Sequence, residues 1–534
     1  MVHGTIFLNG RFRTLDPEQP RAEAMAVGGE HILAVGGGGD LRAAFPRFRT
    51  IDLRGRAVLP GIVDAHIHFA SYGLSLRRVD LVGAATLGEA VARVKVAVPH
   101  ARPGEWIIGR GWDHNPWPED RFPNKGDLDP AVPHHPAVLT RKDGHVVWVN
   151  SAALAKAGIT RDTPDPPGGQ IERDAGGEPT GLLKEEARRL VWDVVPPPDE
   201  EGYAEAIKAA CAAVHRRGVV GVHNIESPDV LRAMQTLCAR GELTVRVAAM
   251  VRAESTEEAI GVGLRTGLGD PWLRIAQIKI FADGTLGSQT AWMLEPFDGQ
   301  PGNTGIPIHS PDDLRRLVRR AVEAGFAVAI HAIGDRANRE ALDALEVVYG
   351  ESRRRGLRHR IEHVQVLHPA DLDRLAALGV VASMQPIHAT SDRDAAERYW
   401  GRRSRYAYAW RTILDRGTRL AFGSDAPVES PDPFKGLYAA VTRQREDEPS
   451  VPSWYPEECL TLNEALRAYT VGAAYAVGEE RIRGTLSVGR LADFMVLARD
   501  PYETPPEAWL TMPVEATVVG GRVVHAVGAL SGME

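Results

Sequence analysis

The sequence predicts an α/β protein that combines a (β/α)8 TIM barrel, a small composite β-sandwich domain formed by both termini, and a large insertion after the first barrel strand. Three observations predict this class. The middle of the 534-residue chain alternates between short apolar stretches and amphipathic segments. Both ends carry short alternating stretches bounded by turn residues. The spacing between two expected barrel strands also leaves a long surplus of chain.

The barrel is predicted from eight apolar stretches interleaved with helical patterns, the order typical of this architecture. One such helix is expected at 310–325 (SPDDLRRLVRRAVEAG), because it begins with a capping serine and early acids and ends with glycine. The expected strands are residues 59–68, 218–224, 244–250, 273–281, 326–331, 358–363, 380–386 and 419–425.

Residue spacing predicts the insertion. One βα unit of this barrel takes roughly 31 residues, and the 32 residues from His331 to His363 match one unit. From His68 to Lys279 there are 211 residues, where three units would take about 95. The surplus of about 115 residues places an insertion at about 76–200. A long insertion on the carboxyl side of a barrel strand is expected to cap the active site.

The two ends of the chain are predicted to form one β domain. TIFLNGRFRT and EAMAVGGEHILAVGG near the start, and LADFMVLARD and EATVVGGRVV near the end, alternate as strands do. Each end has too few strands for a stable sheet of its own. We therefore expect a composite β-sandwich of about 1–57 and 483–534, which leaves 58–482 for the barrel and its insertion.

Composition and charge exclude several classes of protein. A net charge of −7 at pH 7 gives no basic footprint for nucleic acid or an anionic membrane. No apolar run reaches the roughly 18 residues of a membrane helix, and the first residues lack the order of a signal peptide. We expect a cytoplasmic protein without a nucleic-acid or membrane partner. No sequence feature fixes a symmetry, so a homodimer stays an open candidate.

Polar side chains recur where the expected barrel strands end, which predicts a metal site. Alternation along VDAHIH puts residues 64, 66 and 68 on one face of the first strand. A single histidine at a strand end is usually only a hydrogen-bonded side chain, but several at one end of a barrel share a site. Neutral imidazole and carboxylate suit zinc, and also manganese, iron or cobalt. The candidate ligands are His66, His68, His331, His363 and Asp425.

Lys279 completes the candidate site. The chain has only eight lysines among its 63 basic residues, and this one stands inside the apolar strand LRIAQIKIF. Burial lowers the pKa of a lysine, and a neutral amine reacts with carbon dioxide to give a carbamate that can bridge two cations. Arginine cannot do this, because its pKa stays above about 12. The alternative is an ordinary ion pair with Asp283.

The residues quoted so far resemble the metal-dependent amidohydrolase superfamily, and more narrowly its YtcJ-like branch, which includes N-substituted formamide deformylase. The resemblance implies the barrel and terminal β-sandwich, and hydrolysis of carbon–nitrogen bonds outside ordinary peptides. One departure is His223-Asn224 after the second strand, where relatives often carry an aspartate nearby. The matching stretches are LPGIVDAHIHF, GRGWDHNPWP, RKDGHVVWVNSAAL, KIFADGTLGSQTA, HAIGDRA, RIEHVQ, FGSDAPVESPDP and GTLSVGRLADFMVL.

With this resemblance, we expect a centre of two divalent ions, most simply zinc, bridged by carbamylated Lys279. Asp64 is expected either to orient a ligand histidine or to have a structural role. The expected ligands are His66, His68 and Asp425 for the more buried ion, and His331 and His363 for the other.

The expected reaction is attack of a metal-bound hydroxide on the carbonyl of a small non-peptide amide, such as an N-substituted formamide or N-acyl compound. Asp425 is expected to take the proton and pass it to the leaving nitrogen. In the insertion, His145 is expected to stabilise the oxyanion or bind a substrate carbonyl. The alternative, that insertion residues pack their own core, stays open. The candidate substrate-binding residues are Trp112, Asp113, Arg141, His145 and Asn150.

Two other functions compete with this one. A deaminase of the same superfamily with one metal would share the paired histidines and final aspartate. Such enzymes usually carry a glutamate just after the fifth strand, where this chain has HAIGD, and Lys279 would have no role. A non-catalytic relative would keep the barrel as a binding or assembly module, but such proteins commonly lose ligands, and every expected position is filled here.

Overall fold

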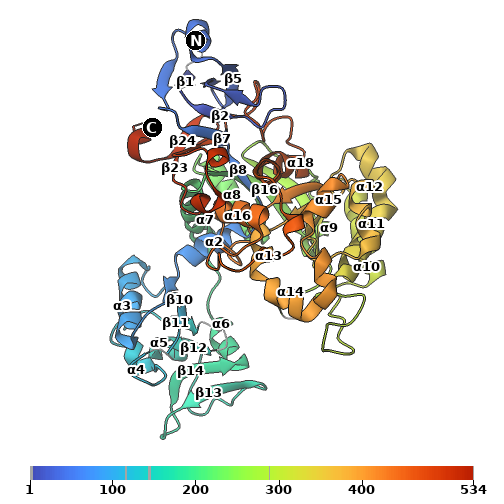
Figure 1. Ribbon diagram of the computed structural model, residues 1–534. Coiled ribbons are helices and arrows are strands. Elements are labelled where there is room, and N and C mark those ends of the chain that lie inside the picture. Colours follow the sequence, from blue (N-terminus) through green and yellow to red (C-terminus); the bar gives the residue numbers. More distant parts are fainter. Residues whose placement is uncertain (1–3, 115–116, 142–145, 288, 533–534) are drawn as a thin grey trace. The chain divides into compact units, whose positions relative to one another are not determined.

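The computed structural model describes residues 4–114, 117–141, 146–287 and 289–532 (Figure 1). The chain divides into two compact units: Met1–Gly73 with Tyr203–Glu534, and Leu74–Gly202. The first unit contains the barrel and the strands of both termini. Among the described residues, no helix combines the length and apolar character needed to cross a membrane.

An eight-stranded parallel sheet forms the centre of the first unit and confirms the predicted barrel. Its strand order is β21-β20-β19-β18-β17-β16-β15-β8. The edge between the first and last strands is joined where they end: the Asp425 N–H donates to the His66 carbonyl at 2.7 Å, and the His68 N–H to the Ala426 carbonyl at 2.9 Å. The strands are β8 (Ile62–Ile67), β15 (Val219–Ile225), β16 (Arg246–Arg252), β17 (Leu273–Phe281), β18 (Ala327–Ala332), β19 (Arg360–His363), β20 (Val381–Met384) and β21 (Arg419–Phe422).

The helix expected at 310–325 forms, and it is one residue shorter at its start and two residues shorter at its end. In α10 (Pro311–Glu323) the hydroxyl of Ser310 accepts from the Asp313 N–H, which caps the helix. The buried face of α10 consists of small and branched apolar residues, and it packs beside α11 (Asp335–Arg355). Gly356, with φ 67°, ends α11 in a left-handed conformation that favours glycine.

Strands from both ends of the chain form two further sheets, ordered β5-β4-β1-β6 and β24-β23-β22-β7-β2-β3. The rings of Phe7 and Phe494 meet edge-on at 5.0 Å in the core that both sheets share. These strands are β1 (Gly4–Leu8), β2 (Arg11–Arg13), β3 (Arg21–Ala22), β4 (Ala24–Gly28), β5 (His31–Gly36), β6 (Arg49–Asp52), β7 (Ala57–Pro60), β22 (Phe494–Leu497), β23 (Val514–Val519) and β24 (Arg522–Ala526).

The stretch 59–68, expected as one barrel strand, is two strands that meet at Gly61. The Gly61 N–H donates to the Asp493 carbonyl at 3.0 Å, whereas the next N–H, of Ile62, donates to the Gly218 carbonyl at 3.0 Å. The chain therefore leaves the terminal sheets and enters the barrel within one residue. A side chain at Gly61 would place its Cβ 2.3 Å from Val220 Cγ1, so only glycine fits without a shift.

The Leu74–Gly202 unit has its own sheet, ordered β13-β14-β12-β11-β10-β9. Helix α3 (Leu87–Ala97) contributes buried apolar residues to the same core as this sheet. The unit matches the insertion expected at about 76–200. Its strands are β9 (Val79–Asp80), β10 (Ile107–Trp112), β11 (Ala137–Arg141), β12 (Val146–Val149), β13 (Gly169–Arg173) and β14 (Pro179–Glu185).

Candidate metal centre

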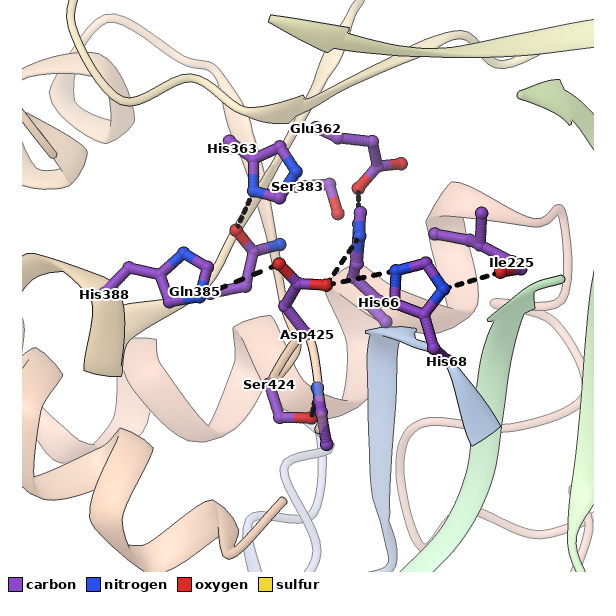
Figure 2. A network of polar contacts seen from close by, with 12 residues as sticks. His66, His68, Ile225, Glu362, His363, Ser383, Gln385, His388, Ser424 and Asp425 are labelled. Atoms are coloured by element: carbon purple, nitrogen blue, oxygen red, sulfur yellow. Dashed lines mark hydrogen bonds and ion pairs between the residues drawn. The ribbon is translucent and has the colours of Figure 1, made fainter. Parts of the chain in front are cut away.

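The structure brings the four predicted histidines together at the carboxyl ends of the barrel strands, and Figure 2 shows three of them, His66, His68 and His363, around Asp425. His66 lies on β8 and His68 just beyond it, while His331 is on β18 and His363 ends β19. The ring centroids of His66 and His363 are 4.8 Å apart, and those of His331 and His363 are 4.5 Å apart. Because parallel strands of a barrel end on one face, each strand delivers its side chain to the same place.

Asp425 joins this group from the segment after β21. Its Oδ1 lies 3.4 Å from Nε2 of His66 and 3.4 Å from Nε2 of His68. Both Asp425 (φ 60°) and His363 (φ 75°) have left-handed backbones, which are uncommon for residues other than glycine. Such strain is often retained at functional sites, where the surrounding structure holds it in place.

Each of the four imidazoles has one ring nitrogen held by a protein acceptor, which fixes the ring and leaves the other nitrogen for an ion. The nitrogens left over are Nε2 of His66, His68 and His363, and Nδ1 of His331. The contacts that hold the rings are His66 Nδ1 to Glu362 Oε2 (2.5 Å), His68 Nδ1 to the Ile225 carbonyl (2.8 Å), His363 Nδ1 to Gln385 Oε1 (2.8 Å) and His331 Nε2 to the Gly284 carbonyl (3.1 Å).

The donor set fits a divalent metal ion. Ligand atoms of His66, His363 and Asp425 lie within 4.8 Å of one another. Burial lowers the pKa of His331 to about 3 and that of His363 well below its usual range, so both rings are neutral and keep a lone pair. Burial opposes ionisation of Asp425, but the histidines around it hold its pKa well below the usual range. Neutral imidazoles beside a carboxylate are typical zinc ligands.

Lys279, on β17, is buried, and its Nζ has no hydrogen-bond partner among the described residues. Burial lowers the pKa of this amine to about 8. Asp283, the alternative partner, instead accepts from the backbone N–H groups of Trp292 (2.8 Å), Ile333 (3.0 Å) and Gly334 (2.8 Å). An orphaned buried amine beside a set of metal ligands fits the carbamate chemistry expected from the sequence better than it fits an ion pair.

Asp64 accepts hydrogen bonds from backbone N–H groups rather than from an imidazole ring. Its Oδ1 accepts from the N–H of His66 at 3.1 Å and of Ser424 at 3.0 Å, and its Oδ2 accepts from the Ser424 hydroxyl at 2.5 Å. Burial raises the pKa of Asp64 to about 6. This carboxyl therefore ties β8 to the segment that carries Asp425, which is the structural one of its two expected roles.

An acidic residue, Glu226, directly follows the second barrel strand, β15. Its carboxylate accepts from the N–H groups of Ala70 and Ser71 at 2.7 Å each, at the start of α2 (Phe69–Leu76). The side chain of Asn224 accepts from the Phe69 N–H at 3.0 Å. Together these two side chains fix the first turn of the helix that follows His68.

His388 was not predicted, yet it lies at the site. It sits on α13 (Pro386–Ser391), and its ring stacks on His363 with centroids 6.0 Å apart. Its Nε2 lies 3.8 Å from Asp425 Oδ2. The same rule that found the other histidines, a polar residue just after a barrel strand, applies to QPIH after β20 and would have found it.

The described candidate residues of the 74–202 unit make contacts within that unit. Trp112 is fully buried and donates to the Leu139 carbonyl at 2.8 Å. Asn150 caps α5 (Ser151–Lys156), and Arg141 contacts Asp113 at 3.2 Å. These contacts match the packing alternative for Trp112 and Asn150, and a role in substrate binding stays a prediction. His145 lies outside the described residues.

Comparison with known proteins gives matches along nearly the whole chain. The model of the amidohydrolase family matches residues 49–525. The chain is similar to the putative amidohydrolase YtcJ of Bacillus subtilis (strain 168), with 34% identity over 97% of this chain and 99% of the relative. It is also similar to N-substituted formamide deformylase of Arthrobacter pascens, with 29% identity over 97% of each chain.

A solved structure matches at a similar level. It is an uncharacterized metal-dependent hydrolase from Pyrococcus furiosus, with a TM-score of 0.79 and 30% identity over 94% of this chain and 100% of that chain. Its likeness extends over the barrel, the terminal sheets and the 74–202 unit alike, because so little of either chain is left unmatched.

Proposed function

Because this chain belongs to the amidohydrolase family and is a metal-dependent hydrolase of carbon–nitrogen bonds outside peptides, we propose that it cleaves the amide bond of a small N-substituted formamide or N-acyl compound. The family confirms the resemblance seen in the motifs. Support for the substrate class comes from the deformylase relative, which matches over 97% of both chains.

The observation that carries the proposal is the tethering of four imidazoles around Asp425 and the orphaned amine of Lys279. In a mononuclear site the buried amine would keep no hydrogen-bond partner among the described residues, and burying such an amine is costly. A carbamate on Lys279 would turn the amine into a metal ligand, and it would add a second carboxylate-like group beside Asp425. We therefore favour two ions over one.

The residues divide naturally into two ligand groups. His66 and His68 share Asp425 Oδ1 at 3.4 Å each and would hold one ion with it, whereas His331 and His363 would hold the other, and carbamylated Lys279 would bridge the two. Zinc suits these ligands, and manganese, iron or cobalt would also fit. A bound divalent ion supplies Lewis acidity, which acidifies a coordinated water and polarises a carbonyl oxygen.

Asp425 moves the proton. Its carboxylate is ionised, because its pKa lies well below the usual range, so it can accept a proton from the attacking water. It then donates this proton to the leaving nitrogen as the carbon–nitrogen bond breaks. Water and amide are thereby converted to an acid and an amine, with no other reactant. Glu226 and Asn224 keep the backbone beyond His68 in place during these steps.

The test is a panel of N-alkyl and N-aryl formamides and N-acyl amines, with acid and amine release both quantified. We expect one acid per amine, and a loss of about 10²–10⁴-fold in kcat for Asp425→Asn. Metal content of both proteins, measured by mass spectrometry, separates loss of the base from loss of an ion. Ammonia released from a cyclic amidine, with no amide turned over, would replace this proposal with deamination.

A further inference from the structure

The acceptors behind the four imidazoles are chemically unequal. Glu362, which gives His66 a charged acceptor at 2.5 Å, is a carboxylate, whereas the other three rings are held by neutral oxygens. These are two backbone carbonyls and the side-chain amide of Gln385. Asp283 Oδ1 also approaches His331 Nε2, but at 3.5 Å, and its oxygens already accept three backbone N–H groups.

The charge on Glu362 is held in place by Arg360, two residues earlier on β19. Arg360 Nε lies 2.5 Å from Glu362 Oε1, and its Nη2 lies 3.1 Å from Oε2. Both side chains are completely buried. The carboxylate of Glu362 therefore lies between a guanidinium on one side and the imidazole of His66 on the other. Because a guanidinium is always charged, this contact favours a negative charge on Glu362 behind His66.

The guanidinium itself is anchored on three other strands. Its Nη1 donates to Nδ1 of His223 at 2.8 Å, and its Nη2 donates to the Ser383 hydroxyl at 2.8 Å. Nη2 also donates to the backbone carbonyl of Ala65, beside His66. The pair is therefore part of the buried barrel interior, where Glu362 contacts the ring of His66 (Figure 2).

A carboxylate behind a metal-bound imidazole raises the basicity of the ring and fixes its orientation, and losing such a partner typically lowers metal affinity about 10–100-fold. We propose that Glu362, held by Arg360, is a positioning residue that makes the ion position of His66 the tighter of the two. This inference rests on the proposed two-ion centre. The neutral acceptors behind His331 and His363 leave their position the weaker one.

Two reciprocal substitutions test the inference. Glu362→Gln keeps the size of the side chain and an acceptor for His66 but removes the charge. Gln385→Glu introduces a charge behind His363, at a residue whose Nε2 is buried and has no hydrogen-bond partner among the described residues. Metal-free wild type and both variants are titrated with Co²⁺ against a competing chelator. The number of ions, each affinity and the visible absorption of bound Co²⁺ are recorded, so the readout does not depend on activity.

We expect wild type to bind two ions with unequal affinities. In Glu362→Gln the tighter affinity falls about 10–100-fold with a changed absorption spectrum, whereas in Gln385→Glu the weaker affinity rises. An unchanged tighter affinity in Glu362→Gln, or a loss confined to the weaker ion, overturns the inference.

Two results, a single bound ion or a variant that does not fold, would require a different comparison. If wild type binds one ion, the two-ion proposal fails, and the effect of Glu362→Gln on that ion alone decides the role of Glu362. If Glu362→Gln does not fold, because Arg360 is left as an unpaired buried charge, the double variant Arg360→Met/Glu362→Met is measured instead, since it buries no unpaired charge. Its melting temperature without metal must match wild type, and a tighter affinity equal to that of wild type contradicts the inference.

Discussion

Lys279 offers the sharpest prediction, because its pKa determines how fast it can react with carbon dioxide. Only the neutral amine forms a carbamate. With a pKa of about 8, close to 10% of the amine is neutral at pH 7 and about 90% at pH 9. The initial rate of carbamate formation should therefore rise about tenfold between these pH values and then level off. An ordinary lysine, with a pKa near 10.4, would gain about a hundredfold and keep rising.

The assay follows ¹³C-labelled carbon dioxide by NMR on metal-free protein, at a fixed carbon dioxide concentration so that only the amine changes with pH. Lys279→Arg should remove one carbamate signal, since arginine is never neutral in this range. The matched control is Lys435→Arg, at a lysine that pairs with Glu446 at 2.8 Å, and it should keep that signal. A spectrum that Lys279→Arg leaves unchanged, or a rate for the Lys279 signal that climbs tenfold per pH unit beyond pH 9, would refute the reasoning.

Three substitutions elsewhere, with Gly39→Ala as the control for one of them, test the contacts described above. Asp64→Ala should lower the free energy of unfolding by about 3 kcal/mol or more, measured by urea denaturation, because it leaves three buried donors unpaired. Gly61→Ala should cost about 1–3 kcal/mol in the same measurement through overpacking against Val220. Gly39→Ala, whose Cβ would point into open space, should cost less. Asn150→Ala should make the 74–202 unit more sensitive to limited proteolysis while leaving the barrel resistant, because the capping amide is lost; equal sensitivity of both units would contradict this.

The barrel and the place where the candidate ligands gather could be predicted because their signals are local. Several predicted strands are short apolar stretches that end in a polar residue. The strand predicted at 273–281 agrees with β17 at both ends. His66, His331 and His363 were found by that rule alone, and the structure brings their rings together.

Other features could not be predicted, because they depend on which distant segments pair. The stretch LPGIVD alone does not show that the backbone changes its hydrogen-bond partner at Gly61, from Asp493 to Gly218. In the sequence RHRIEH, Arg360 and Glu362 look like the polar residues of any alternating strand. Their role becomes visible only in the structure, where they form a salt bridge and Glu362 contacts His66 on another strand. Trp112 was likewise predicted to bind substrate, but its side chain is fully buried. Residue type alone does not distinguish a tryptophan in a core from one that lines a pocket.

The change of partner at Gly61 has a consequence for how the chain assembles during synthesis. The strand that carries His66 is continuous with β7, whose neighbour β22 begins only at Phe494. Asp493, beside that strand, also receives the N–H of Gly520 at 2.7 Å. Through β7, the first barrel strand is therefore held by residues that are synthesised after all the other barrel strands. Pairing over such sequence separations is slow. In a nascent chain stalled before residue 490, β8 and its His66 should therefore be poorly ordered. Such a chain should be cleaved by proteases even though all eight barrel strands have been synthesised.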